Sequence, residues 1–264
     1  MTLGFPRLTS AVRTLIAINV AVFVVNLVYF LVSQDNRGLA TWLSLSSARL
    51  RDNPVLGLLT FVTYQFVHSL QDPFHILMNM LLLYFLGTVV EEAVGPRRLV
   101  WLYLMSGFAG GALWILISML VGGPSVVGAS GAVYGILVFA ACMFPRMEIL
   151  FMVVRLPLWV LAVILVGVAA YMTALTVRSG NPVGSVADAA HLGGAAYGFL
   201  LHRLERMGLG AWWARVRAGM ARQREEHKEH RLDAILHKIS QHGMTSLTAS
   251  ERRFLEEESR RRKR

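Results

Sequence analysis

A serine and a histidine each lie among glycines inside strongly apolar stretches of this chain. Ser130 lies in Gly-Ala-Ser-Gly at 128–131, and His191 lies in Ala-His-Leu-Gly-Gly at 190–194. Polar side chains are costly at membrane depth, so those found there usually face the interior of a helix bundle and mark function. A hydroxyl near an imidazole is also the minimum equipment for nucleophilic acyl chemistry. The pair therefore predicts a hydrolase whose active site lies inside a membrane.

Other polar residues recur at helical spacing near these two. His75 and Asn79 are four residues apart within another apolar stretch, so they share one helix face. Tyr134 lies one turn after Ser130, on the same face. A plain lipid anchor needs none of these side chains, which are therefore further candidates for the site.

Small residues should allow the helix of Ser130 and the helix of His191 to approach closely. Each of these two stretches carries a pair of glycines four residues apart, a spacing that lets two helix backbones pack against each other. These glycines are Gly131, Gly135, Gly194 and Gly198. Such packing would bring His191 within reach of Ser130.

The composition predicts an all-α, polytopic membrane protein. Of 264 residues, 55% are hydrophobic and only 16% are charged, which is too apolar for a water-soluble domain of this length. We expect six transmembrane helices, the first of them retained rather than cleaved as a signal peptide. The apolar stretches lie at 14–33, 74–90, 99–121, 129–144, 151–177 and 187–202. The fourth and sixth are short and rich in glycine, so we expect neighbouring helices to enclose them.

The candidate residues should lie at similar depth. If the N-terminus is cytoplasmic, the second, fourth and sixth helices all run from the outer to the inner side of the membrane. His75, Ser130 and His191 each lie near the start of one of these helices. All three should then lie in the outer part of the membrane, where water can reach them from one side.

The charge distribution favours cytoplasmic N- and C-termini. Up to His202 the chain has ten Lys and Arg against seven Asp and Glu, and from Arg203 onward sixteen against nine. This orientation places the basic tail inside, as the positive-inside rule requires. The net charge of +10 is then explained by anionic membrane lipids, without a nucleic acid partner.

We expect two domains, a membrane domain at 1–202 and a basic cytoplasmic tail at 203–264. The long loop at 34–73 should contain short helices lying in the outer interface. Candidate headgroup-level anchors in it are Trp42, Phe61 and Tyr64.

The tail should form a small helical hairpin. Its apolar residues at 232–239 follow helical periodicity, and Gly243 is placed to end that helix. Residues Thr248–Glu251 have capping-box spacing for a second helix. The pattern does not identify a partner for the tail.

Together these features resemble the rhomboid family of intramembrane serine proteases, in its six-helix bacterial form. The similarity extends over roughly residues 10–205. The segments that carry it are His75–Asn79, Glu91–Gly95, Tyr103–Gly107, Gly128–Gly135 and Ala190–Gly194. A Trp-Arg pair that the family often has in its first loop is absent, because Val55–Leu59 occupies that place.

The resemblance implies a Ser-His dyad that cuts peptide bonds in or near transmembrane segments of other membrane proteins. Ser130 would be the nucleophile and His191 the general base. The Ser130 backbone N–H would hold the oxyanion, assisted by His75 and Asn79. Tyr134 would support the His191 ring, and Gly128 would keep the backbone near the oxyanion uncluttered. The resemblance implies no metal or organic cofactor, and it favours a bacterial plasma membrane, with an organelle membrane as the alternative.

Purely structural roles were weighed for the same residues. Ser130 could simply cap its helix, and His191 could be a packed histidine. His75 and Asn79 could merely hydrogen-bond helices together. Tyr134 is better explained as a packing residue than as a participant in the chemistry.

Two residues near the candidates invite further roles. Asp188, three residues before His191, could complete a triad, but we favour a helix cap facing the outer water. His68 is expected at the membrane interface. No metal site is expected, because Cys142 is the single cysteine and His75 and Asn79 lack further ligands at usable spacing.

Two other functions were considered for the whole chain. One is a rhomboid-like pseudoprotease that binds membrane proteins without cutting them, although such relatives usually lack the serine or the histidine. The other is a transporter, which is disfavoured because the sequence contains no internal repeat.

Overall fold

The computed structural model describes residues 7–33, 38–151, 154–181 and 187–208, and short parts of 232–255. Contacts between Cα atoms divide the chain into two units, Met1–Arg203 and Leu204–Arg264. Each unit is described by itself below.

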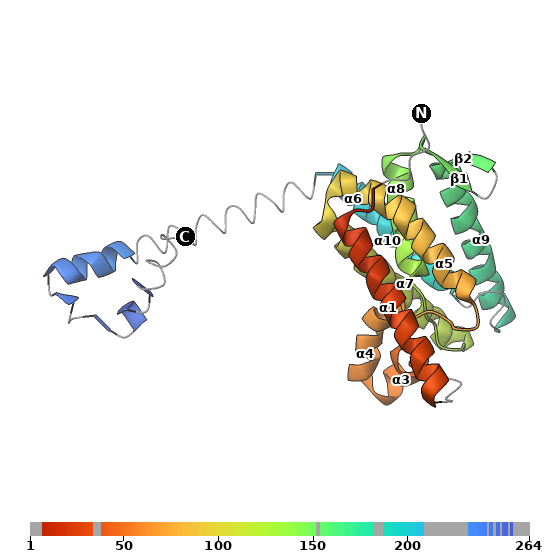
Figure 1. Cartoon of the computed structure of the whole chain (residues 1–264), viewed down its shortest axis with the longest axis horizontal. Helices are drawn as coiled ribbons and strands as arrows, with labels where there is room; N and C mark the ends of the chain where they lie inside the picture. Colours follow the sequence, from red (N-terminus) through yellow and green to blue (C-terminus); the bar gives the residue numbers. More distant parts are fainter. Residues whose placement is uncertain are drawn as a thin grey trace. The chain divides into compact units, whose positions relative to one another are not determined.

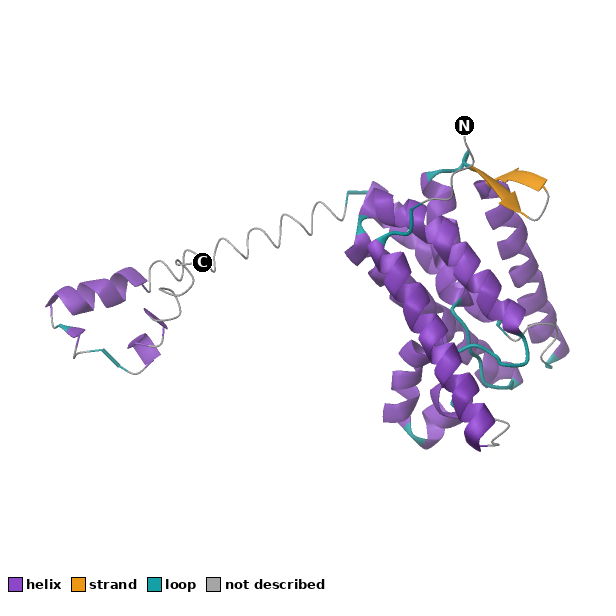
Figure 2. Cartoon of the chain, viewed as in Figure 1, coloured by secondary structure: helices purple, strands orange, loops and turns teal. Residues whose placement is uncertain are grey.

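The first unit consists of helices with one β-hairpin (Figures 1 and 2). The hairpin is antiparallel and pairs Glu148 with Pro157. In chain order the elements are α1 (Ser10–Ser33), α2 (Ala40–Leu43), α3 (Ser47–Asp52), α4 (Pro54–Thr63), the 3₁₀ turn η1 (Tyr64–Phe66), α5 (Pro73–Leu82), the π-helical turn η2 (Leu83–Gly87), α6 (Thr88–Val94), α7 (Pro96–Val121), α8 (Ser130–Met143), β1 (Glu148–Phe151), β2 (Val154–Pro157), α9 (Leu158–Ser179) and α10 (Asp188–Arg206).

Each of the six predicted apolar stretches contains a helix. In the described part of the chain, four helical segments are long and apolar enough to cross a membrane: Ser10–Ser33, Pro73–Val94, Pro96–Val121 and Leu158–Ser179. Helix α8 is apolar but has only 14 residues, and α10 is not among the four. The chain is thus a mostly helical, polytopic membrane protein.

The predicted fifth helix begins later than expected. We expect it from residue 151, but Phe151 ends β1, Val154–Pro157 form β2, and α9 starts at Leu158. Pro157 explains the difference, because proline disfavours helical backbone in the residue before it. Pro157 itself has an extended ψ of 139° and directly precedes the first helical residue.

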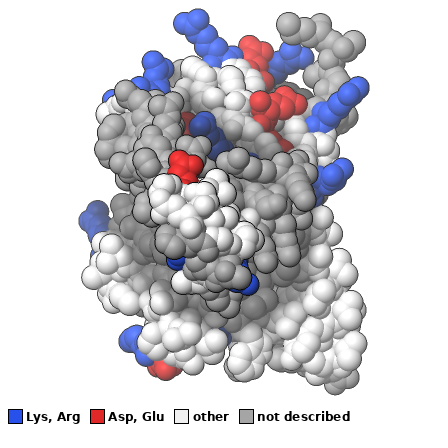
Figure 3. Space-filling model, turned by 90° about the vertical axis from the view of Figure 1, so that its left-hand side faces the viewer, with Lys and Arg blue, Asp and Glu red and all other residues white. Residues whose placement is uncertain are grey.

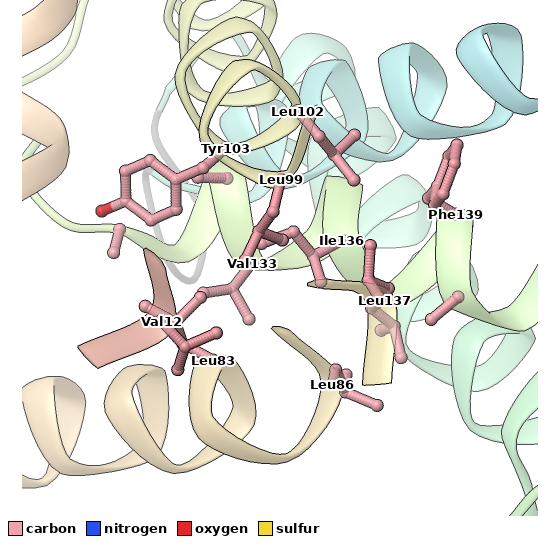
Figure 4. Packing of buried hydrophobic residues seen from close by; sticks show 14 of the residues in the cluster. Val12, Leu83, Leu86, Leu99, Leu102, Tyr103, Val133, Ile136, Leu137 and Phe139 are labelled. Atoms are coloured by element: carbon pink, nitrogen blue, oxygen red, sulfur yellow. The ribbon is translucent and has the colours of Figure 1, made fainter. Parts of the chain in front are cut away.

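Helix α8 forms the centre of the bundle (Figure 4). Its residues Val133, Ile136 and Leu137 are buried against α7 and the α5–η2–α6 segment, from which Leu83 and Leu102 reach them. Because neighbouring helices surround α8, it does not need the length of a lipid-facing span. The prediction that the short fourth helix is enclosed is confirmed.

The loop at 34–73 contains short helices, as predicted, but two of its three expected anchors are wrong. Phe61 and Tyr64 are buried, and the Tyr64 hydroxyl donates to the Gly107 carbonyl oxygen at 2.5 Å. Both aromatic rings therefore attach the loop to α7. Trp42 is 67% exposed, so its role as a headgroup anchor stays a prediction.

The second unit is described only in part. Residues 232–241 are helical, and Gly243 follows with a positive φ of 75°. The capping box is present: the Thr248 N–H donates to Glu251 Oε2 at 2.7 Å, and the Glu251 N–H donates to Thr248 Oγ1 at 3.3 Å. Lys238 also forms a 3.0 Å ion pair with Glu251. The basic end at 256–264 lies outside the described residues.

Candidate active site

Helices α8 and α10 touch backbone to backbone. A Cβ atom added to Gly194 would lie 1.9 Å from the Gly131 carbonyl oxygen, and one added to Gly198 would lie 2.2 Å from that of Gly135. No side chain fits at such distances, so the two helices can approach this closely only at glycine. This is the contact that the glycine spacing predicts, and it sets the start of α10 beside the start of α8.

The contact brings the serine and the histidine together. His191 Nε2 lies 2.8 Å from Ser130 Oγ, and Ser130 is the first, buried residue of α8. A neutral imidazole with its proton on Nδ1 accepts the hydroxyl proton at Nε2. The capping alternative for Ser130 is wrong, because Ala129 occupies the N-cap and the helix start has no side-chain cap hydrogen bond.

Tyr134 holds the imidazole in one plane. Its ring is stacked on that of His191, with 4.2 Å between centroids and 6° between planes. The stacking agrees with the packing role expected for Tyr134. Stacking sets the plane of the ring, and the contact of Nε2 with Ser130 sets its orientation within that plane.

Gly128 and His75 meet just before the serine. Gly128 has a φ of +126°, which other residues rarely adopt, and an added Cβ would lie 2.7 Å from His75 Cε1 and 3.0 Å from His75 Nε2. The imidazole of His75 therefore lies against the backbone that leads to Ser130. Asp72 caps α5 by accepting the His75 backbone N–H at 3.3 Å, which fixes the start of this helix.

Among the described residues, the side-chain amide of Asn79 forms hydrogen bonds with His75 and His68 and none with Ser130 or His191. Its side-chain nitrogen donates to the His75 carbonyl oxygen at 2.9 Å and lies 3.4 Å from His68 Nε2. These two contacts use both N–H bonds of the amide. To assist an oxyanion, Asn79 must exchange one of them.

His68 belongs to the site, and its expected place at the interface is wrong. It is fully buried, and its Nε2 accepts the Ala129 N–H at 3.4 Å. Burial lowers the pKa of His68 to about 4, with a smaller contribution from the neighbouring His75. The neutral ring can accept from both Asn79 and Ala129, which a protonated ring could not. The only signal in the sequence was a second histidine seven residues before His75.

The segment 122–129, which carries the glycine and leads to Ser130, is fixed by the first loop. Leu45 and Val126 exchange two backbone hydrogen bonds of 3.0 and 2.9 Å. The Gly128 N–H donates to the Tyr64 carbonyl oxygen at 2.9 Å. The first loop therefore positions the backbone around the nucleophile.

The family's Trp-Arg pair is absent, but an arginine of the first loop forms hydrogen bonds within that loop. The Arg49 guanidinium donates to the carbonyl oxygens of Thr41 and Trp42. Residues Val55–Leu59 lie in α4, where four of the five are exposed.

Asp188 is buried, so its expected exposure to the outer water is wrong, while a helix-stabilising role at the start of α10 stays a prediction. The residue is only 8% exposed, and its Oδ1 lies 3.6 Å from His191 Nδ1. Both residues are on the first turns of α10, three positions apart.

Comparison with known proteins shows the family of the chain. The family described as "Rhomboid domain" matches residues 55–207, which is more than half of the chain. The chain belongs to the rhomboid family. A second family, described as a family of unknown function (DUF6576), matches residues 221–261 in the tail.

Two curated relatives are also named as rhomboid proteins. RHOMBOID-like protein 12, mitochondrial, of Arabidopsis thaliana is 32% identical over 180 residues, which are 62% of this chain and 48% of the relative. Rhomboid protein 1, mitochondrial, of Saccharomyces cerevisiae is 34% identical over 155 residues, 57% of this chain and 43% of the relative. The chain spans about half the length of the curated relatives that it matches.

Proposed function

We propose that this rhomboid-family chain is a serine endopeptidase that hydrolyses peptide bonds in or near the transmembrane segments of other membrane proteins. The observation that carries the proposal is the 2.8 Å contact between Ser130 Oγ and His191 Nε2. It joins an acyl-transfer nucleophile to its base at the start of a helix that the other membrane helices surround. A plain membrane anchor has no need of such a pair.

In the proposed reaction, His191 takes the hydroxyl proton while Ser130 Oγ attacks the scissile carbonyl carbon. The backbone N–H of Ser130, at the positive end of the α8 dipole, faces the oxyanion that develops. His75, which lies against Gly128, is placed to add a second donor. The imidazolium then protonates the leaving amine. In the second half His191 takes a proton from water as the water oxygen attacks the acyl carbon, and it returns that proton to Ser130 Oγ as the ester bond breaks.

Substrate entry is proposed past α9 and the start of α10. The buried residues of α9 are Leu158, Leu161, Ala162 and Ala169, so the half of this helix nearer Gly180 packs weakly. A substrate helix hides its carbonyl groups in its own hydrogen bonds. Cleavage should therefore favour helix-breaking residues, with a small residue before the scissile bond.

We propose that the six helices α1, α5–α6, α7, α8, α9 and α10 all cross the membrane, with both termini in the cytoplasm. The start of α1 and the β1–β2 hairpin lie at one end of the membrane unit, and α3 and α4 at the other (Figure 1). Charged side chains are most numerous toward the upper end of the view in Figure 3. Exposed arginines near the first end include Arg7, Arg97, Arg98, Arg146 and Arg155.

The proposed location is a bacterial plasma membrane, which rests on the resemblance, whereas the proposed orientation rests on the charge distribution. The relatives do not add to it, because two of them are named as mitochondrial. A cysteine introduced into the tail should react with a membrane-impermeant thiol reagent in inverted vesicles and not in intact cells. The opposite pattern would reverse the orientation.

The proposed activity is tested in proteoliposomes with a single-span substrate protein. The native chain should cut it, and Ser130→Ala and His191→Ala should each abolish cutting. Cutting that survives Ser130→Ala would refute the assigned nucleophile. If no version cuts but the substrate co-purifies with the chain, the binding scaffold is the better explanation.

A further inference from the structure

The carboxylate of Asp188 lies on the far side of the His191 ring from the nucleophile. Asp188 Oδ1 is 3.6 Å from His191 Nδ1, and the two side chains are only 12% and 13% exposed. On the other edge of the same ring, Nε2 contacts Ser130. Serine, imidazole and carboxylate therefore follow one another in the order of an acid–base relay.

Among the described residues, one buried polar atom of each side chain lacks another partner. Within the described part of the chain, neither His191 Nδ1 nor Asp188 Oδ2 has a hydrogen-bond partner, although both are buried. A flip of the ring that turned Nδ1 away would also take Nε2 from Ser130, so the 2.8 Å contact keeps Nδ1 on the side of Asp188. A buried nitrogen and a buried carboxylate that face each other in this way are best satisfied by each other.

We propose that Asp188 is a positioning residue of the dyad. Its carboxylate holds the proton of His191 on Nδ1, so that Nε2 is free to accept the Ser130 hydroxyl proton, and it stabilises the imidazolium that results. The proposal rests on the proposed function. At 3.6 Å the pair is in ion-pair range but longer than a direct hydrogen bond. The effect should therefore be smaller than the loss of about 10⁴-fold known for a directly bonded aspartate.

A purely structural role for Asp188 has different consequences. An acidic residue in the first turn also stabilises a helix through its dipole, so removing it could loosen α10. Asp188→Asn removes the charge and therefore both effects, so the melting temperature is measured beside the rate to tell them apart. Asp188→Glu keeps the charge on a longer side chain.

The test compares the native chain with Asp188→Asn, Asp188→Glu and the control Asp52→Asn, which neutralises an exposed aspartate at the end of α3. The measurements are kcat and KM against pH for a single-span substrate, and the rate at which a fluorophosphonate labels Ser130. In that labelling Ser130 Oγ bonds to phosphorus, fluoride leaves and His191 takes the proton. Melting temperatures in detergent report on folding.

Asp188→Asn should lower kcat and the labelling rate by about 10- to 100-fold, with little change in KM. The acidic limb of the pH dependence should move to lower pH, because an imidazole without the carboxylate takes up a proton less readily. The other titratable groups that face the imidazole, Tyr134 from α8 and His75 from α5, are unchanged in the variant. Asp188→Glu should recover part of the rate, and Asp52→Asn should match the native chain.

Two results would overturn the proposal and leave the protease intact. One is native kcat and labelling in Asp188→Asn. The other is a loss of rate that follows the melting temperature in both Asp188 variants while the acidic limb stays in place, which would indicate a helix cap only. A native chain that neither cuts nor labels would refute the proposed function, and the positioning role with it.

Discussion

Replacing Gly194 by alanine should separate the two helices that carry the dyad. The added methyl carbon would lie 1.9 Å from the Gly131 carbonyl oxygen, whereas a normal contact between carbon and oxygen is about 3.3 Å. The obstacle is backbone, which cannot rotate away as a side chain can. Helices α8 and α10 must therefore move apart by about 1.4 Å.

The same movement acts on the dyad, because Gly131 follows Ser130 and Gly194 is one turn after His191. Added to the 2.8 Å between Ser130 Oγ and His191 Nε2, a separation of about 1.4 Å removes that hydrogen bond. Overpacking of this kind costs about 1–3 kcal/mol of folding free energy. We expect Gly194→Ala to unfold more readily and to label with fluorophosphonate at least 10-fold more slowly.

Gly167→Ala is the matched control. Gly167 also lies within a helix, α9, but an added Cβ meets nothing within 4 Å. Alanine there should be neutral or stabilising by up to about 1 kcal/mol, because glycine loses more backbone entropy on folding. Unfolding in a denaturing detergent and Ser130 labelling are measured for both variants. If Gly194→Ala matches Gly167→Ala in both, close packing of α8 on α10 does not set the dyad geometry.

Two more predictions concern the groups beside the dyad. Asn79→Ala should lower kcat by about 100-fold without abolishing it, as loss of one oxyanion donor does, and an unchanged kcat in proteoliposomes would exclude Asn79 from the oxyanion site. The second concerns His68, whose pKa is about 4 when folded and 6.5 in the unfolded chain. Its contribution to stability is complete above pH 6.5 and is lost as pH falls toward 4, because only the unfolded chain takes up the proton. The free energy of unfolding should drop by about 3 kcal/mol over this window, and a chain with His68→Asn that showed the same drop would refute the assignment.

Much of the site could be predicted because its signals are local. The apolar stretches mark the helices, and the glycines at 131 and 194 are spaced for helix contact whatever surrounds them. The prediction failed where a local signal was overlooked or had two explanations. Pro157 ends the hairpin before α9, and Asp188 suits a helix cap as well as it suits a histidine partner.

The sequence by itself determined which segments are helical, which helix faces are small and which side chains can do chemistry, since these follow from residue type and period. Only the tertiary structure decided what those side chains meet. His68 accepts a hydrogen bond from Ala129, 61 residues away, and Tyr64 packs on α7 instead of facing the interface. Asp188 is only 8% exposed, and the next two residues, Ala189 and Ala190, pack in one cluster with the first loop and α7. Burial and partnership depend on segments that are distant in the chain, and no short pattern around a residue records them.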